Sequence, residues 1–294
     1  MYYVEVCAFA RKLEIIEKYN ERNEEARSRN HLPAGTGSNY QWGYSRRRYG
    51  SWKQSILKMY CLIADLITEV PEAGGLAPRC QAYLYDGNEE SDIVIHEDLY
   101  RREKYHPQIS ENMLAYMESA YQFYRNLVDF SGFYLHSSAV VLDGKAYLFS
   151  GPCGAGKSTH TRLWQSTFGP GAVVINDDKP AIRYMDGQWI VYGTPWCGKD
   201  GINVNAKAPL AGVCFMKKAE ENRIRQLTPV EAMQKILSQT IYKFKEAEQL
   251  DKLLTLMNRF LADIPVYELE NRPESAAARL SYETMLKGAE EKRL

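Results

Sequence analysis

Three patterns in this 294-residue sequence predict a mixed α/β fold. Short β-branched runs pair across tight turns, most clearly in Ala139–Leu142 and Lys145–Ser150, which flank Asp143-Gly144. A glycine-rich loop follows the second run, and a stretch of helical composition follows the loop. The C-terminal part alternates helical and extended patterns. We expect a mixed-sheet core over residues 131–294, preceded over 1–130 by a helix, a loop and a small antiparallel sheet.

The predicted N-terminal region begins with a helix and a loop. Residues 5–29 have helical composition, whereas residues 32–52 are poor in aliphatic side chains and rich in Gly, Ser, Tyr and Arg. Short apolar runs between turn residues then predict the strands of the small antiparallel sheet. These strands are expected at 59–67, 81–85 and 93–95. Apolar residues at helical spacing predict a helix over Ser110–Val128, and we expect its stripe, which includes Tyr116, to pack in the core.

The elements of the core follow from the same periodicities. Asp186-Gly187 predicts a second hairpin, like the one at residues 139–150. Thr228 and Glu231 form a capping box with proline at the first helical position, which predicts a helix start. The expected strands are 172–175, 181–185, 188–192, 210–216 and 264–270, and the expected helices are 158–165, 229–242, 246–262 and 274–287.

The glycine-rich loop predicts a nucleotide site. Residues 151–159 read Gly-Pro-Cys-Gly-Ala-Gly-Lys-Ser-Thr and fit the phosphate-binding loop pattern G-x-x-x-x-G-K-[ST] at every fixed position. The glycines let successive N–H groups turn toward one anion, and the helix N-terminus adds partial positive charge. Lys157 supplies a charge for the β- and γ-phosphates, and the Ser158 hydroxyl can ligate Mg²⁺. The residues expected to contact ATP are Gly151, Cys153, Gly154, Ala155, Gly156, Lys157, Ser158 and Thr159.

Two adjacent carboxylates suggest phosphoryl transfer. Asp177 and Asp178 follow the apolar strand at 172–175, about twenty residues beyond the loop. Phosphoryl transfer needs a metal on the phosphate oxygens and a carboxylate that orients or deprotonates the acceptor. We therefore expect Asp177 and Asp178 to be catalytic, and Ser158 and Asp177 to be candidate ligands of Mg²⁺.

Two further stretches are weaker candidates. The hairpin pattern places His136, at the start of the first core strand, toward the end far from the phosphates. Residues 193–204 form a long Gly-rich loop that contains Lys199 and Asn203, either a binding loop or a simple long turn.

These stretches together resemble the bacterial HPr kinase/phosphorylase family, whose nucleotide-binding core is shared with phosphoenolpyruvate carboxykinases. The resemblance covers roughly residues 131–217 and rests on a His before a hairpin, the phosphate-binding loop, the Asp-Asp pair and the Gly-Ile-Asn-Val of residues 201–204. It implies a mixed-sheet core of the HPr kinase C-terminal type. It also implies that Asp177 is the general base, that Asp178 helps the metal, and that His136 is a catalytic residue near the transferred phosphate.

The first functional hypothesis is an ATP- and Mg²⁺-dependent kinase. Its acceptor would be a hydroxyl, such as a serine of a peptide or protein, or a small molecule. A carboxykinase-like reaction on a small organic acid ranks lower, because it needs several cations and the sequence near the acidic pair offers mainly Arg183 and Lys199. A non-enzymatic nucleotide-binding regulatory protein is the third hypothesis.

Composition sets the remaining expectations. Basic and acidic residues are equal in number, 37 each, so no nucleic-acid or membrane partner is expected. The sequence has no apolar run long enough to span a bilayer and no signal-peptide layout at its start. Its six cysteines are dispersed, which favours reduced thiols in a cytoplasmic protein. The sequence leaves the oligomeric state open, including a homo-oligomer.

Overall fold

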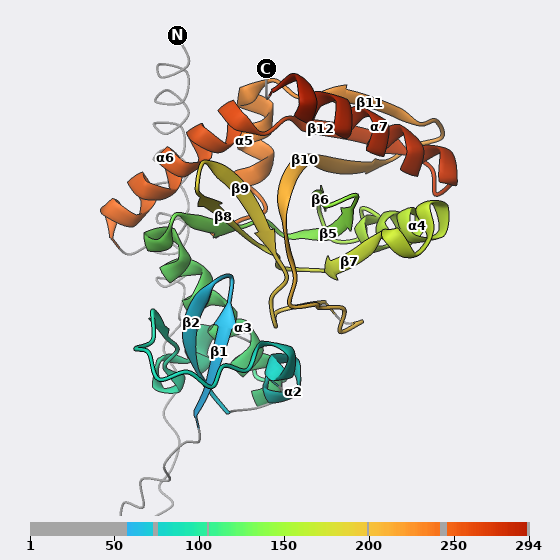
Figure 1. Ribbon diagram of the computed structural model, residues 1–294. Helices are drawn as coiled ribbons and strands as arrows, with labels where there is room; N and C mark the ends of the chain where they lie inside the picture. The colour runs from blue at the N-terminus through green and yellow to red at the C-terminus, as the bar shows by residue number, and fades with distance from the viewer. Residues whose placement is uncertain (1–57, 73–75, 105, 199, 242–245, 293–294) are drawn as a thin grey trace, which may run out of the picture. The chain divides into compact units, whose positions relative to one another are not determined.

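The computed structural model describes residues 58–72, 76–104, 106–198, 200–241 and 246–292, and all of them lie in one compact unit, Ile56–Leu294 (Figure 1). The helix predicted at 5–29 and the loop predicted at 32–52 lie outside the described residues. The proposed domain boundary after residue 130 stays a prediction. Among the described residues, no helix combines the length and the apolar character that crossing a membrane requires.

The small sheet contains β1 (Lys58–Ile63), β2 (Leu66–Pro71) and β3 (Ile93–Val94). The single strand predicted at 59–67 is wrong, because Ala64 and Asp65 adopt positive φ angles of 54° and 58° and turn the chain into an antiparallel hairpin. β3 pairs with β2 in parallel, so the sheet is mixed and not purely antiparallel as expected.

The strand predicted at 81–85 is also wrong. This segment continues a helical turn, α2 (Ala77–Cys80), into a 3₁₀ turn, η1 (Gln81–Tyr83), and a single bridge links Leu84 to Cys61. Pro78 lies in the first turn of α2, where its missing N–H is tolerated. Cys80 and Tyr83, three residues apart, are both buried, so the apolar spacing follows a helical period and not the period of two that a strand requires.

The main sheet is organised around one long strand, β10 (Lys207–Lys218). The start of β10 pairs antiparallel with β9, and the remainder pairs in parallel with β6 on one side and β12 on the other. A register shift between Leu210 and Gly212 marks the change. The strand order is β4 (Gly132–Tyr134), β8 (Ala181–Met185), β9 (Gln188–Tyr192), β10, β6 (Lys145–Ser150), β5 (Ser137–Leu142) and β7 (Val173–Asn176), with β12 (Val266–Asn271) joining β10 to β11 (Arg223–Gln226).

The two hairpins predicted from Asp-Gly pairs are confirmed. Asp143 and Gly144 join β5 to β6 with φ angles of 50° and 70°, and Asp186 and Gly187 join β8 to β9 with φ angles of 49° and 82°. Two positive φ angles in succession define the type I′ turn that suits twisted antiparallel strands. β4 and β11, of three and four residues, were not anticipated.

In the part of the chain that the structure describes, five longer helices complete the fold. They are α3 (Glu111–Leu127), α4 (Lys157–Phe168), α5 (Pro229–Leu237), α6 (Ala247–Asp263) and α7 (Ser275–Glu291). The capping box of Thr228 and Glu231 starts α5 as predicted, although α5 ends at Leu237, before the expected residue 242. α4 and α7 pack together beside the sheet (Figure 1). Trp164 of α4 is fully buried there and donates from Nε1 to the Ser281 hydroxyl of α7 at 3.0 Å.

Candidate functional site

Strand pairing brings three sequence motifs together at the ends of neighbouring strands. They are His136, the glycine-rich loop and the acidic pair. Ser137 of β5 pairs with Ser150 of β6, and Ala139 of β5 pairs with Asn176 of β7. The start of β5 therefore lies between the ends of β6 and β7. The expectation that the hairpin would carry His136 to the far end is wrong, because an antiparallel hairpin returns the end of its second strand to the start of its first. The Ser150 hydroxyl donates to the His136 carbonyl at 2.8 Å.

The glycine-rich loop lies between β6 and α4. Gly151, Gly154 and Gly156 have φ angles of 142°, 79° and 101°, and Gly156 is the N-cap of α4. A side chain on Gly156 would meet no other atom, so the requirement for glycine there is conformational. The conformation leaves Cys153 and Gly154 exposed at the N-terminal end of α4.

Lys157 folds back over this loop. Its Nζ donates to the carbonyls of Gly151 at 2.9 Å and Pro152 at 3.3 Å. Burial lowers the pKa of the Lys157 ammonium, and the negative charge of Asp178 opposes that effect. Ser158, which follows on α4, is half-buried, and Thr159 is exposed.

The acidic pair lies on a turn that Asn176 holds. Asn176 is fully buried, and its Oδ1 accepts from the backbone N–H groups of Asp178 at 2.9 Å and Lys179 at 2.7 Å. Its Nδ2 donates to the carbonyl of Thr194 at 3.0 Å. One amide thus shapes the turn and fastens it to the loop that follows β9.

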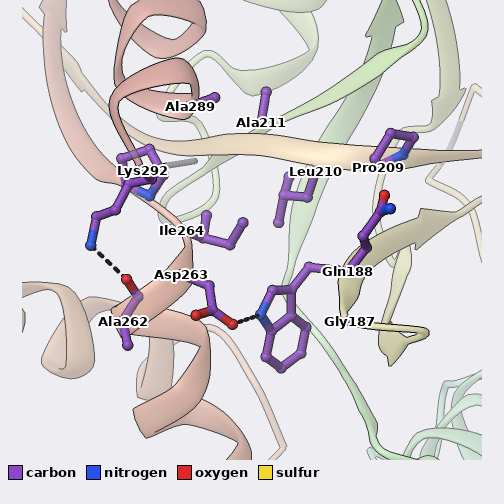
Figure 2. Close-up of a pocket in the computed structure, with 12 residues that line it drawn as sticks. Gly187, Gln188, Pro209, Leu210, Ala211, Ala262, Asp263, Ile264, Ala289 and Lys292 are labelled. Carbon is purple, nitrogen blue, oxygen red and sulfur yellow. Dashed lines mark hydrogen bonds between the residues drawn. The ribbon is translucent and has the colours of Figure 1, made fainter. Parts of the chain in front are cut away.

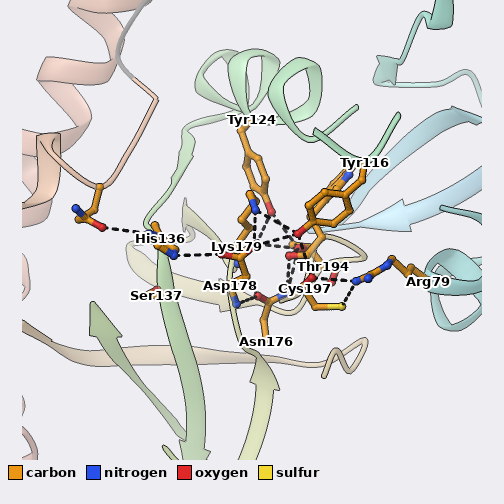
Figure 3. Close-up of polar contacts among 12 residues, drawn as sticks. Arg79, Tyr116, Tyr124, His136, Ser137, Asn176, Asp178, Lys179, Thr194 and Cys197 are labelled. Carbon is orange, nitrogen blue, oxygen red and sulfur yellow. Dashed lines mark hydrogen bonds and ion pairs between the residues drawn. The ribbon is translucent and has the colours of Figure 1, made fainter. Parts of the chain in front are cut away.

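Asp178 is surrounded by hydrogen-bond donors (Figure 3). Its Oδ1 lies 3.2 Å from His136 Nε2, and its Oδ2 accepts from the Tyr116 hydroxyl at 3.0 Å and from Lys179. Burial would raise the pKa of Asp178, but the His136 hydrogen bond and the Lys179 charge outweigh it and hold that pKa well below its usual range. Asp178 is therefore an ionised carboxylate at neutral pH.

His136 is held from its other side by Gln239. The His136 Nδ1 lies 3.1 Å from Gln239 Oε1, and the backbone N–H of His136 donates to the backbone carbonyl of Gln239 at 2.8 Å. Gln239 Nε2 donates to the Ser238 carbonyl at 3.0 Å, which directs Oε1 toward the ring. Both ring nitrogens therefore have a side-chain oxygen within hydrogen-bond distance, and the two contacts fix the orientation of the ring.

Asp177 differs from its neighbour. It is 9% exposed, and its Oδ1 is buried with no hydrogen-bond partner among the residues that the structure describes. An unpartnered buried carboxylate oxygen is costly unless a cation or a donor completes it. Within the same described ranges, no group of three His, Cys, Asp or Glu side chains could hold a metal ion. The Asp177 oxygen is the kind of group that Mg²⁺ takes as a ligand, since Mg²⁺ in nucleotide sites takes one or two carboxylates plus substrate phosphates.

The loop at residues 193–204 contributes to this site. Thr194 is fully buried and donates from Oγ1 to the Lys179 carbonyl at 2.8 Å, and Asn203 pairs with Asn176 in an isolated bridge. Lys199 lies outside the described residues. Arg183, the other cation expected near the acidic pair, instead donates to the Ala64 carbonyl at 2.6 Å and the Phe130 carbonyl at 3.0 Å.

Several polar residues of the site carry no recognisable sequence signal. The sequence analysis placed Tyr116 in the apolar stripe of α3, yet its hydroxyl reaches Asp178 at 3.0 Å and the Cys197 carbonyl at 3.0 Å. Arg79 of α2 donates from Nη1 to that same carbonyl at 2.9 Å. Only the Asn176-Asp177-Asp178 run could have signalled the role of Asn176, as an Asx residue before a turn.

The described residues line at least two hollows, and only one of them borders the acidic turn. One is a cleft of about 510 Å³ that Asp178 lines together with α3 and Arg79. The other, about 230 Å³, lies between the β8–β9 hairpin, β10 and the end of α6 (Figure 2). There Trp189 donates to Asp263 at 2.9 Å and Lys292 donates to the Ala262 carbonyl at 2.6 Å. Because none of the predicted site residues lines this second hollow, we place the candidate site at the first.

Comparison with known proteins gives a family match and a distant structural likeness. The model of a family described as "SynChlorMet cassette protein ScmC" matches residues 104–272. No curated protein matches the chain. Among solved structures, the chain is similar to the Hpr(Ser) kinase/phosphatase from Coxiella burnetii, with 15% identity and a TM-score of 0.31 over 54% of this chain and 92% of that one.

Proposed function

The protein belongs to the SynChlorMet cassette protein ScmC family, whose model spans more than half of the chain, and we propose that it is a kinase that transfers the γ-phosphoryl group of ATP to a hydroxyl in the presence of Mg²⁺. One observation carries the proposal. A loop with the phosphate-binding pattern and a carboxylate with an unpartnered buried oxygen, Asp177, flank the same end of β5. The pattern suits phosphates, and the carboxylate suits the metal that accompanies them.

The nucleotide side of the proposed site consists of the loop and the start of α4. The N–H groups after Gly154 and Gly156 and the N-terminus of α4 would bind the β- and γ-phosphates. Lys157 would exchange its present carbonyl acceptors for phosphate oxygens, which a charged donor binds more strongly. Ser158 and Asp177 would hold Mg²⁺, which when bound offsets the charge on the phosphate oxygens.

The acceptor side depends on Asp178, to which we assign the role of base in place of Asp177. Asp178 lines the 510 Å³ cleft and is kept ionised by His136 and Lys179. As the acceptor oxygen forms its bond to the γ-phosphorus and the bond to the β-phosphate oxygen breaks, the hydroxyl proton passes to the Asp178 carboxylate and ADP leaves. Most of the rate would come from positioning and charge stabilisation.

A thermal-unfolding experiment tests the nucleotide site without knowledge of the acceptor. A ligand that binds only the folded protein raises the unfolding midpoint. We expect Mg²⁺ with ATP to raise it in the wild type, and Lys157→Ala to weaken ATP binding by roughly 100-fold, the equivalent of one charged hydrogen-bond donor. The midpoint shifts with ADP, GTP and pyrophosphate, compared with that of ATP, show which part of the nucleotide the protein binds.

The matched control is Lys145→Ala, because Lys145 begins β6, the strand that leads into the loop, and so lies at the end of that strand away from the loop. That variant should keep the full midpoint shift with ATP. If none of the four ligands shifts the wild type, the proposed nucleotide site is refuted. If ATP shifts the wild type and Lys157→Ala equally, nucleotide binds somewhere other than this loop.

A further inference from the structure

The cleft beside Asp178 has a chemistry of its own. We infer that it is the acceptor site and that it takes a hydroxyl compound that also carries an apolar group and a carboxylate. This inference rests on the proposed kinase function. The residues that line the cleft include Arg79, Met113, Tyr116, Met117, Asp178 and Lys179. The volume of the cleft, about 510 Å³, is in the usual range for a small ligand or a short peptide segment.

Asp178 connects the cleft to the nucleotide side. Its Oδ1 faces His136 at the start of β5, whereas its Oδ2 faces Tyr116 from α3, which is a wall of the cleft (Figure 3). Asp177 does not line the cleft. A hydroxyl bound there would therefore meet Asp178, and not Asp177, as its proton acceptor.

Arg79 gives the cleft its selectivity for an anion. Its Nη1 donates to the carbonyl and Sγ of Cys197, both at 2.9 Å, and its guanidinium lies 5.1 Å from the centre of the Tyr116 ring. Its Nε and Nη2 have no hydrogen-bond partner, and no carboxylate pairs with it, among the residues that the structure describes. Lys179, by contrast, already pairs with Asp178. Arg79 is thus a positioned cation with free donors, which suits a carboxylate.

The apolar part of the cleft comes from two methionines of α3. Met113 is 49% exposed and Met117 is half-buried, one turn further along the same face of the helix. Methionine side chains are flexible and polarisable, so they adapt to apolar groups of different shape. An acceptor that satisfies the whole cleft therefore places an apolar group on Met113 and Met117, its hydroxyl at Asp178 and its carboxylate at Arg79.

Binding can be measured by NMR of ¹³C-methyl methionine in the full chain. The chain has nine methionines, and Met→Leu variants assign the signals of Met113 and Met117. The probes are acetyl-Leu-Ser-Asp-amide, its Asn isostere, and the Gly variant that lacks the leucine side chain. We expect the Asp peptide to shift both signals, and the Asn peptide to bind about tenfold more weakly because one charged hydrogen bond is lost.

Arg79→Gln should remove the difference between the Asp and Asn peptides. Arg259→Gln is the matched control, because Arg259 also stacks on a tyrosine, Tyr184 at 4.4 Å, but does not line the cleft. Met113→Glu is a second variant at an exposed position and should weaken both peptides, the Asp peptide more, because it removes an apolar contact and adds a negative charge. The inference is overturned if neither methionine signal moves with the Asp peptide, or if the Asp and Asn peptides bind equally.

Two further measurements separate this inference from the proposed function. The ATP-induced midpoint shift should be unchanged in Arg79→Gln and reduced in Lys157→Ala. Loss of the ATP shift in the wild type with retained Asp-peptide selectivity would refute the kinase and uphold the cleft as an acid-binding site. β-Hydroxybutyrate distinguishes the source of the ligand: equal shifts with it support a small hydroxy acid, and shifts with the peptide alone support a peptide.

Discussion

The glycine-rich loop and the acidic turn lie at the same edge of the sheet but are held by different parts of the chain. Lys157 and Ala155 bond to carbonyls of Gly151 and Pro152, all within seven consecutive residues. The turn that carries Asp178 is bonded instead by side chains of α3, of the residue before β5 and of the loop after β9. The glycine-rich loop should therefore tolerate substitutions in other parts of the chain. The turn that carries Asp178 should be sensitive to them, because distant side chains hold it.

The largest expected effect is at Asn176. Asn176→Ala removes a fully buried amide and leaves its backbone partners unpaired, so we expect the free energy of unfolding to fall by about 3–5 kcal/mol. Urea denaturation measures the change. Asn205→Ala is the control, because Asn205 is exposed and makes one bond, to the Ala82 carbonyl, so its loss should be about 1 kcal/mol. Equal losses in the two variants would show that the acidic turn is as self-sufficient as the loop.

The next effect distinguishes the two carboxylates. Asp177→Asn should weaken ATP binding in Mg²⁺ by about 10- to 100-fold, or ~1.4–2.8 kcal/mol, and leave ATP binding in EDTA unchanged. Asp178→Asn should leave both affinities nearly unchanged, because we assign Asp178 to the acceptor. Calorimetric titration with and without Mg²⁺ measures both. The reverse pattern would exchange the roles of the two residues.

A pH titration examines the ion pairs of the turn. His136 and Lys179 hold the pKa of Asp178 below the value of about 3.9 that an Asp has in the unfolded chain. Their contacts with the ionised Asp178 therefore stabilise the fold fully above pH ~3.9. As pH falls below about 4, the unfolded state takes up a proton first, and stability declines by up to ~1.4 kcal/mol per pH unit. In Asp178→Asn, the free energy of unfolding measured by urea denaturation should fall less steeply with pH between neutral and acid pH than in the wild type. An identical pH dependence in the two proteins would mean that Asp178 does not contribute to the loss of stability at acid pH.

The smallest expected effect is at Gln239, which holds the His136 ring. Gln239→Leu removes the acceptor for Nδ1 and should cost about 1 kcal/mol of stability. Gln239→Glu keeps an acceptor and should cost less. The ¹⁵N shifts of the His136 ring should change in Gln239→Leu and stay close to those of the wild type in Gln239→Glu. An unchanged ring signal in Gln239→Leu would show that Asp178 alone orients His136.

The structure agrees with the sequence where a few neighbouring residues dictate the backbone angles. The Asp-Gly turns, the capping box at Thr228 and the glycine positions of the loop depend on residues within a few positions of one another. The boundaries of α3 differ from expectation by one residue at each end, because Ser110 caps the helix and accepts from the Met113 N–H. The failures at 59–67 and 81–85 arose because short apolar runs do not separate a strand from a hairpin or a helical turn.

The sequence by itself determined the glycine-rich loop, the strand before it and the helix after it, because backbone angles and hydrogen bonds close within that stretch. Only the tertiary structure decided that His136 lies beside Asp178, that Tyr116 leaves the apolar stripe to bond it, and that Arg79 faces the same cleft. These contacts join residues as far apart in the chain as Arg79 and Cys197. They depend on which strands are neighbours and on how α3 packs, and no local pattern encodes either.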